Sequence, residues 1–252
     1  MSVLRSALFL LWMYGGLVVL GLLWLPSLLM PRQVAVAGIR LFARHVRAGL
    51  TWIVGAPTEI RGLHNLPEGP VLYTGKHQCM WDVLIPFLVR PDPAIIMKRE
   101  LNWYPVFGWY ALKTAMIPID RAGASRTLRR MVKTAVARRD AGRDVVIFPE
   151  GTRHPPGAVV GYFSAGTGAL YKSLDVPVVP VATNSGLCWP ARGIGRRRGR
   201  IVYEILPPIS PGLDRRMMMS RLENALEPAS ARLLEEGLDA QGRTKADLGL
   251  AA

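Results

Sequence analysis

The sequence contains few cysteines and few charged residues, and acidic residues are the scarcer of the charged groups. The two cysteines, Cys79 and Cys188, lie far apart and form no C-x-x-C pair, which excludes a disulfide framework and a zinc knuckle. Charged residues make up 20% of the 252 residues, below the roughly 25% of typical soluble domains, which excludes a disordered chain. Lys and Arg outnumber Asp and Glu by 32 to 18, for a net charge of +14. High hydrophobicity combined with this basic balance indicates a membrane surface, an anionic ligand or both.

Charge is absent altogether from one long stretch near the N-terminus, the segment Ala7–Met30. A helix that crosses the hydrocarbon core of a bilayer needs about 20 apolar residues, so this segment is long enough. A cleaved signal peptide is the alternative, but no small-residue cleavage site follows the apolar run. The segment therefore predicts a retained membrane anchor.

The next segment, Val34–Gly55, is apolar apart from a few basic residues. Its three arginines are spaced to form one stripe on a helix: Arg40, Arg44 and Arg47. Such a helix suits the membrane interface, where arginines reach anionic lipid phosphates. Pro26 and Pro31 favour a turn between the two segments, so a single span and a helical hairpin both remain open.

After Pro57 the pattern changes to short β-branched runs that alternate with helical periodicity. This alternation predicts an α/β fold, with a mixed, mostly parallel sheet flanked by helices. We expect two parts, N-terminal membrane-anchoring helices over residues 1–56 and a second domain over residues 57–252. The expected strands are Val71–Thr74, Ala94–Met97, Ala115–Ile119, Asp144–Phe148, Pro177–Ala182 and Ile201–Leu206. The expected helices are Trp81–Val89, Ser125–Ala141, and a long helix Asp214–Glu236 interrupted near Pro228.

His77 is the histidine whose surroundings favour chemistry. It follows the buried run Val71–Thr74 and Gly75, and Asp82 lies five residues further on. Five residues turn through about 140° on a regular helix, so the two side chains meet only if His77 lies in a loop and Asp82 in the first turn after it. Asp82 would then fix the imidazole tautomer and leave the other nitrogen as a general base. The H-x-x-x-x-D pattern alone is weak, and an ordinary surface or core histidine remains the alternative.

A second candidate site is the segment Phe148–Arg153, directly after an apolar strand. A glycine-containing turn presents backbone N–H groups, and Arg153 adds a planar fork that suits a phosphate. Glu150 would orient Arg153 or hold a hydroxyl. The alternative is a surface turn with an ordinary salt bridge.

Two further segments place polar residues or prolines at predicted strand ends. Asp120 and Arg121 follow the run Ala115–Ile119. The segment Val176–Val181 carries two prolines, and because proline belongs at strand edges and ends we expect it to line a cleft.

Taken together, these segments resemble the glycerolipid acyltransferase superfamily, and within it the 1-acyl-sn-glycerol-3-phosphate acyltransferases. The similarity covers roughly residues 57–210, with all four family blocks in order. The blocks are matched by His77 and Asp82, by Ile119, Asp120 and Arg121, by Phe148–Arg153 letter for letter, and by Val176–Val181. Ala115 departs from the pattern, because the family has glycine there.

The resemblance implies transfer of a fatty acyl group from acyl-CoA or acyl carrier protein to the sn-2 hydroxyl of lysophosphatidic acid, which gives phosphatidic acid. His77 would be the general base and Asp82 its orienting partner. The residues implied at the substrate phosphate are Arg121, Glu150, Gly151, Thr152 and Arg153. No metal or organic cofactor is needed, because thioester cleavage is downhill. The implied location is a membrane, of the bacterial inner-membrane type, with the active site on the cytoplasmic surface and anionic lipids as partners.

Four alternatives compete with this interpretation. Cys79 would carry the acyl group if the enzyme used a thiol nucleophile. The arginine clusters at 126–139 and 192–200 would suit nucleic acid, but no nucleic-acid-binding motif accompanies them, so we expect no nucleic-acid partner. The acceptor would differ if another lysophospholipid, or an amino-acid-derived lyso-lipid, were the substrate. The protein would bind lipid without turnover only if the His77–Asp82 pair had no catalytic role.

Overall fold

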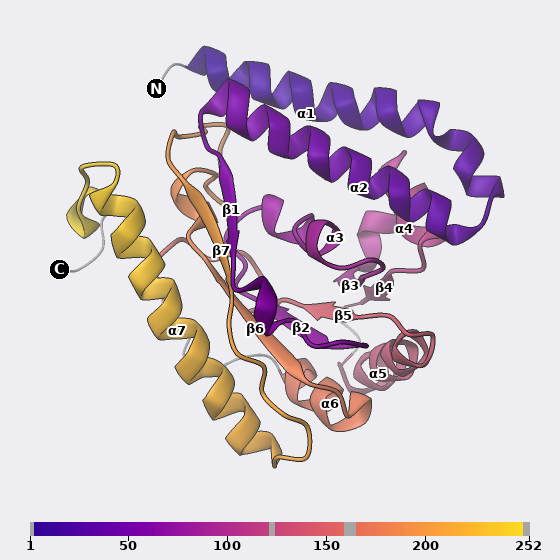
Figure 1. Cartoon of the computed structure of the whole chain (residues 1–252). Helices are drawn as coiled ribbons and strands as arrows, with labels where there is room; N and C mark the ends of the chain where they lie inside the picture. The colour runs from indigo at the N-terminus through magenta and orange to yellow at the C-terminus, as the bar shows by residue number, and fades with distance from the viewer. Residues whose placement is uncertain (1–2, 121–123, 159–164, 249–252) are drawn as a thin grey trace.

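The strands form one sheet with helices on both faces (Figure 1). The computed structural model describes residues 3–120, 124–158 and 165–248. The seven strands of the sheet lie in the order β1-β7-β6-β2-β5-β3-β4. Their bounds are β1 Thr58–Arg61, β2 Leu72–Gly75, β3 Ala94–Lys98, β4 Ile117–Ile119, β5 Val145–Ile147, β6 Val178–Thr183 and β7 Ile201–Ile205. Neighbouring strands are parallel except for the antiparallel pair β6 and β7. The predicted mixed, mostly parallel sheet is therefore confirmed.

The helices divide between the two faces of the sheet. Their bounds are α1 Val3–Leu23, α2 Arg32–Gly49, α3 Pro86–Val89, α4 Phe107–Lys113, α5 Ala124–Asp140, α6 Ala165–Leu174 and α7 Arg215–Asp239. Shorter helical turns span Leu25–Leu29, Leu50–Val54, Leu63–Asn65, Trp81–Val83, Arg99–Trp103, Ser185–Leu187 and Lys245–Leu248. The first four helices lie toward one face, while α5, α6 and most of α7 cover the other (Figure 1).

Alternation along the central strands produces two separate core layers. In β5, Val146 packs in the layer below the N-terminal helices, whereas Val145 and Ile147 pack against α5 and α6. In β2, Tyr73 and Leu72 divide in the same way. Because side chains on a strand alternate between faces, a sheet covered on both sides needs apolar residues at consecutive positions.

The helices α1 and α2 form an antiparallel hairpin that lies across the rest of the fold (Figure 1). Phe9 and Met13 of α1 and Val46 of α2 are at most 1% exposed and belong to the same core layer as the sheet. Among the described helices, α1 is the one long and apolar enough to cross a membrane. The hairpin is thus integral to the hydrophobic core as well as apolar on its outer surface.

Two arginines of the predicted stripe on α2 also bond to the rest of the protein. The Nε of Arg40 donates to the Phe87 carbonyl at 3.1 Å, and a terminal nitrogen of Arg47 donates to the Thr58 carbonyl at 3.0 Å. These two side chains join the hairpin to the domain, since each satisfies a carbonyl at the end of a neighbouring segment. Arg44 is exposed.

Two predicted helices also need correction. The helix α7 continues through Pro228 without interruption, and its N-cap Asp214 accepts a hydrogen bond from the Met217 N–H at 3.0 Å. The segment Trp81–Val89 is not one helix, because it divides into the turn Trp81–Val83 and the short helix α3. Pro86 begins α3, where its missing N–H needs no partner.

The segment Val176–Val181 does not line a cleft as predicted. Its residues Val178–Val181 belong to β6, which lies inside the sheet between β2 and β7 and is buried along its length. Pro180 is tolerated there because no residue of β7 pairs with it, and its carbonyl accepts the Leu206 N–H at 2.9 Å. The position without an N–H therefore lies just beyond the paired residues of β7, which end with Ile205 opposite Val181.

Candidate functional site

The sequence-predicted site residues gather at the carboxyl ends of neighbouring strands. Because β2 is parallel to both β5 and β6, the chain leaves all three strands at one edge of the sheet. His77 lies two residues beyond β2, Glu150 three beyond β5, and Ser185 two beyond β6. The carboxyl edge of an open parallel sheet is where α/β proteins bind their ligands.

The Asp82 carboxylate lies at the centre of this edge and is 2% exposed. Asp82 Oδ2 lies 3.0 Å from His77 Nδ1 and accepts the backbone N–H groups of Gln78 and Cys79 at 2.6 and 2.7 Å. Its Oδ1 accepts the hydroxyls of Ser185 and Tyr203, both at 2.6 Å. The predicted contact between His77 and Asp82 is therefore present in the structure.

These hydrogen bonds keep Asp82 ionised. Burial by itself would raise the pKa of this carboxyl, but the bonds from His77, Cys79 and Ser185 outweigh it and hold the pKa below the usual value. An ionised carboxylate accepts and cannot donate, so the imidazole proton lies on Nδ1. The Nε2 of His77 is then free of that proton and available as a base.

His77 itself is held from two further sides. Its ring stacks on Phe148, with ring centroids 4.4 Å apart and an interplanar angle of 27°. Its carbonyl accepts the His154 N–H at 2.9 Å, which ties the β2 loop to the end of the Phe148–Arg153 turn. The side chain is 16% exposed, so it reaches the surface from a fixed position.

Cys79 is unsuited to act as a thiol nucleophile. Its side chain is fully buried, and the thiol points to Asp82 Oδ1 at 3.4 Å. Burial, together with the neighbouring Asp82 charge, raises the pKa of the thiol well above its usual value. Because only the thiolate is a good nucleophile, this geometry disfavours the covalent alternative.

Beside His77 lies a buried ion cluster that the sequence did not predict. Lys76 Nζ lies 2.6 Å from Glu150 Oε1 and 2.9 Å from Glu227 Oε1 of α7. The Lys76 and Glu150 side chains are 3% and 0% exposed, and Glu150 Oε2 accepts the His77 N–H at 3.3 Å. Burial raises the pKa of Glu150, while Lys76 opposes that rise. Glu150 thus faces Lys76 and the His77 backbone rather than open solvent.

The rest of the Phe148–Arg153 turn lies outward. Gly151 adopts a left-handed conformation (φ 71°), and its N–H donates to the Phe148 carbonyl at 3.0 Å, which closes the turn. Thr152 and Arg153 are exposed, and within the described parts of the chain Arg153 forms no ion pair. The turn therefore offers a guanidinium to a ligand at the same edge as His77.

The predicted Asp120–Arg121 pair is placed only in part. Asp120 directly follows β4, the last strand of the sheet, and its Oδ2 lies 3.1 Å from a terminal nitrogen of Arg99. Arg121 lies outside the described residues. Among the side chains that are described, no three His, Cys, Asp or Glu residues converge as metal ligands.

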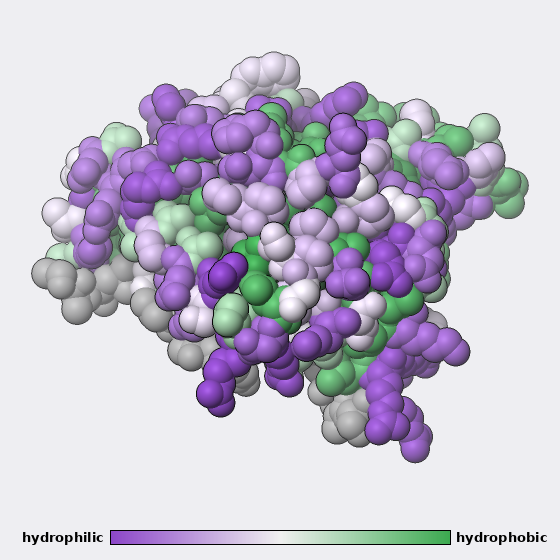
Figure 2. Space-filling model, turned by 60° about the horizontal axis from the view of Figure 1, so that its bottom comes forward, coloured by the Kyte–Doolittle hydropathy of each residue, from purple (hydrophilic) through white to green (hydrophobic). Residues whose placement is uncertain are grey.

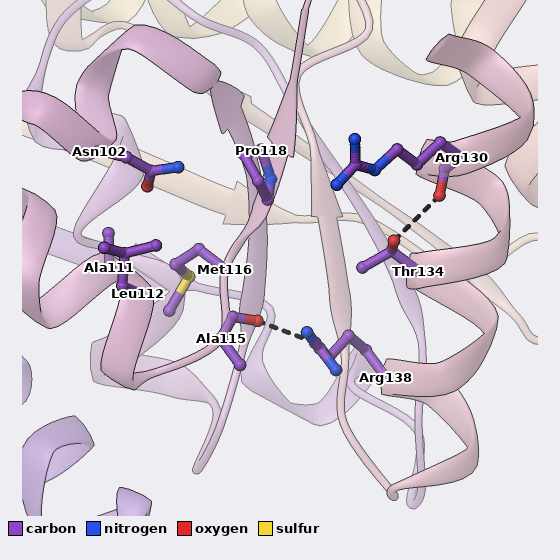
Figure 3. Close-up of a pocket in the computed structure, with 9 residues that line it drawn as sticks. All are labelled: Asn102, Ala111, Leu112, Ala115, Met116, Pro118, Arg130, Thr134 and Arg138. Atoms are coloured by element: carbon purple, nitrogen blue, oxygen red, sulfur yellow. Dashed lines mark hydrogen bonds between the residues drawn. The ribbon is translucent and has the colours of Figure 1, made fainter. Parts of the chain in front are cut away.

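A cavity of about 300 Å³ lies away from His77, between α4 and α5 (Figure 3). Ala115 lines it at the amino end of β4, in a left-handed conformation (φ 53°), and its carbonyl accepts from Arg138 Nε at 2.9 Å and from Arg143 at 3.2 Å. Glycine suits such a conformation, which explains why the family pattern has glycine there. The alanine in place of the family's glycine therefore affects backbone conformation at the amino ends of the strands. His77 lies at their carboxyl ends.

The fold is thus a mostly parallel sheet with a histidine, held by a buried carboxylate, at its carboxyl edge. The acyltransferase family profile matches residues 57–184. The chain belongs to this family, as its motifs predicted.

Curated relatives carry a more specific name. A 1-acyl-sn-glycerol-3-phosphate acyltransferase of Pseudomonas aeruginosa is 37% identical over 155 residues, which cover 62% of this chain and 60% of that protein. A 1-acyl-sn-glycerol-3-phosphate acyltransferase alpha of Mus musculus is 30% identical over 176 residues, or 68% of this chain and 60% of that protein. The chain thus matches about three fifths of the length of these relatives.

A solved structure shows the same fold. The 1-acyl-sn-glycerophosphate (LPA) acyltransferase PlsC from Thermotoga maritima superimposes with a TM-score of 0.77, at 21% identity, over 91% of this chain and 96% of that one. Because the superposition includes most of residues 1–252, the similarity of fold extends beyond the region that the family profile matches.

Proposed function

We propose that this protein is a membrane-bound acyltransferase that moves a fatty acyl group from acyl-CoA or acyl carrier protein to the sn-2 hydroxyl of lysophosphatidic acid. The product would be phosphatidic acid, for phospholipid biosynthesis. The observation that carries the proposal is His77 held by the buried, ionised Asp82 at the carboxyl edge of an acyltransferase-family sheet. The names of the relatives supply the acceptor.

In the proposed reaction His77 Nε2 accepts the proton of the sn-2 hydroxyl while the hydroxyl oxygen attacks the thioester carbonyl. The resulting tetrahedral intermediate expels the thiolate when the carbonyl re-forms. The imidazolium then gives its proton to the thiolate, so His77 returns to its starting state. Asp82 keeps the Nδ1 proton in place throughout and stabilises the positive charge that develops on the ring.

The phosphate of the acceptor needs a cationic partner near His77. Arg153 is exposed on the turn that His154 ties to His77, and its planar fork suits a phosphomonoester. Gly151 and Thr152 share that turn, and Arg121 is carried over from the family motif. Glu150 supports the turn through Lys76 and the His77 N–H, which makes it a positioning residue in this proposal.

In this proposal the hairpin of α1 and α2 is embedded in one leaflet of the bilayer and holds the site at the membrane surface. Near the start of α1, the Ser6 hydroxyl accepts the Arg196 N–H at 2.9 Å, and near its end the Gly21 carbonyl accepts from the Tyr110 hydroxyl at 2.8 Å. Both ends of this helix, about 30 Å apart, therefore contact the same domain. One end of a helix that crossed the bilayer would lie on the opposite side of the membrane from the domain. The contacts at both ends of α1 therefore favour the hairpin alternative. We place the active site at the cytoplasmic surface of an inner-type membrane, where anionic lipids attract the +14 chain.

The test is an acyl-transfer assay on the full chain in phospholipid vesicles. Labelled acyl-CoA and acyl carrier protein are each supplied with lysophosphatidic acid, other lysophospholipids and an amino-acid-derived lyso-lipid. We expect phosphatidic acid as the main product and a loss of about 10²–10⁴-fold in His77→Ala. Arg153→Lys should raise KM for lysophosphatidic acid more than KM for the acyl donor. A folded His77→Ala chain with near-normal turnover, or faster acylation of another acceptor, would overturn the mechanism or the acceptor, respectively.

A further inference from the structure

Large apolar side chains that face solvent gather in two places among the described residues, at 3–30 and at 103–112. The second group consists of Trp103, Tyr104, Phe107, Trp109 and Leu112, which are 83, 60, 38, 43 and 60% exposed. We call these five side chains the 103–112 patch. Single exposed apolar residues are normal on a protein surface, but a contiguous cluster marks a surface that another phase or molecule covers. The face seen from below the hairpin, by contrast, presents mostly hydrophilic side chains (Figure 2).

The patch is attached to the N-terminal hairpin on its inner side. Tyr110 and Ala111 of α4 are buried while their neighbours Trp109 and Leu112 face outward, so α4 is amphipathic. Tyr110 packs with Val106 and Ala35 of α2, and its hydroxyl bonds to the Gly21 carbonyl. Val106 fits so closely over Gly21 that a Cβ at Gly21 would lie 2.2 Å from its side chain. The position of the patch relative to α1 is therefore fixed.

The apolar surface continues from the patch onto the turn of the hairpin. Leu23, Leu25 and Leu29 are 71, 40 and 94% exposed at that turn, and the turn packs against α4 through Leu28. The exposed apolar side chains of the two segments thus belong to elements that pack against each other. A partner that covers the turn would also reach the patch.

The composition of the patch favours a lipid surface as that partner. Tryptophan and tyrosine concentrate at the headgroup level of membranes, where an apolar ring and a polar N–H or O–H are both satisfied. Basic residues lie at both ends of the segment, namely Lys98, Arg99 and Lys113, against Glu100 and the Asp120 that pairs with Arg99. Such a segment complements the phosphates of anionic lipids.

We propose that the 103–112 patch is a second membrane-binding surface, which inserts into the headgroup layer of an anionic bilayer beside the hairpin. A helical hairpin alone contacts a membrane along one line, about which the domain would rock. A third element in the same layer prevents that rotation and fixes the height of the carboxyl edge above the lipid. The inference rests on membrane association by the hairpin and not on the identity of the acyl acceptor.

Site-directed labelling can test this insertion directly. Cys79 and Cys188 are 0 and 1% exposed, so a cysteine introduced by Trp103→Cys in the full chain can be labelled selectively with a nitroxide. The matched control is Met217→Cys on α7, at a residue that is 45% exposed. In vesicles of phosphatidylglycerol and phosphatidylcholine, the label at position 103 should collide several-fold less with a water-soluble nickel chelate and more with oxygen than the label at 217.

A second measurement covers the contribution of the patch to binding. The triple variant Trp103→Ser, Trp109→Ser, Leu112→Ser should keep its unfolding temperature, because these side chains are exposed, and should partition into the vesicles about tenfold less strongly. Equal nickel accessibility at 103 and 217 would overturn the proposal. Spin–spin broadening at 103 would also overturn it, because it would show that a second copy of the chain covers the patch. Neither readout depends on turnover, so failure here is distinguishable from failure of the proposed acyl transfer.

Discussion

Lys76 shows how a single residue adjusts the chemistry of its neighbours. Its ammonium lies between Glu150 of the turn after β5 and Glu227 of α7. Three segments that are distant in the sequence thus meet at this ion cluster. A buried charge is tolerated only when it is paired. The lysine thus opposes the rise that burial causes in the pKa of Glu150, whose other oxygen accepts the His77 N–H.

Replacement of Lys76 should make stability depend on pH through Glu150. In Lys76→Met the opposing cation is gone, so the pKa of Glu150, which burial already raises, should rise further. A carboxyl whose folded-state pKa is raised destabilises the fold once it loses its proton, so the loss of stability should grow as pH rises above about 4.3, the unfolded value. We expect about 3 kcal/mol near pH 7, measured as thermal unfolding against pH.

Two control variants separate this effect from a general loss of packing. Adding Glu150→Gln to Lys76→Met should flatten the added pH dependence, because the carboxyl that Lys76 had neutralised is gone. Lys245→Met removes a lysine from the exposed pair with Glu235 and should change stability little at any pH. A pH-independent loss in Lys76→Met would show that the lysine acts through packing alone.

Ala115 allows a second test at the residue scale. Its left-handed conformation (φ 53°) costs an alanine about 1–2 kcal/mol. Glycine avoids this cost, but it also raises the conformational entropy of the unfolded chain, which offsets part of the gain. Ala115→Gly should therefore stabilise the protein by about 0.5 kcal/mol, and Ala115→Val should destabilise it, as measured by thermal unfolding. A stabilising Ala115→Val would contradict the conformational explanation, since a β-branched residue tolerates this region least.

At the scale of elements, the close approach of α1 and α2 depends on glycine. A Cβ at Gly16 would lie 2.1 Å from His45 Nε2. The His45 ring cannot move aside easily, because it stacks on Trp12 at 4.3 Å and bonds to the Trp12 carbonyl at 2.9 Å. The two helices therefore pack with backbone near side chain, as closely spaced helices do in lipid.

Gly16→Ala should separate the hairpin and destabilise the protein by about 1–3 kcal/mol. The matched control is Gly15→Ala, where a Cβ would meet nothing within 4 Å and helix propensity should make the change neutral or stabilising. Thermal unfolding of both variants in the same lipid or detergent checks the difference. Equal effects of the two substitutions would contradict the packing explanation.

At the scale of the whole molecule, the hairpin and the sheet share one core. Phe9 packs edge-on against Trp189 with ring centroids 5.3 Å apart, and Arg196 stacks on the same tryptophan at 4.5 Å. These contacts join α1 to the loop after β6. The hairpin is thus part of the folding unit in addition to its proposed place in the membrane.

Deletion of residues 1–55 should therefore leave a chain that does not fold. It removes Phe9, Met13, Val46 and Leu50, each at most 1% exposed, and fully burying one such side chain is worth about 1.5–3 kcal/mol. Circular dichroism should show no cooperative thermal transition for residues 56–252. A cooperative transition near that of the full chain would contradict this expectation and would favour the predicted division into an anchor and a separate domain.

The sequence alone determined the features that depend on local pattern. Apolar runs marked the central strands because β2, β5 and β6 are buried on both faces, and the Phe148–Arg153 motif marked the turn after β5. The His77–Asp82 contact was also predictable, because it spans five residues of one loop. The strand β1 and the helices α4 and α6 were missed, since they are short and α4 and α6 each contain glycine.

The residues that complete the site from distant parts of the chain follow from the tertiary fold. Ser185 and Tyr203 reach Asp82 from 103 and 121 residues away, and Glu227 reaches Lys76 from 151 residues away. These meetings depend on strand order and on the path of α7, which no local periodicity encodes. The position of α1 is likewise not encoded in local sequence, because a membrane span and a hairpin need the same apolar length. The contacts of Ser6 and Gly21 show that both ends of α1 contact the same domain, and this supports the proposed hairpin.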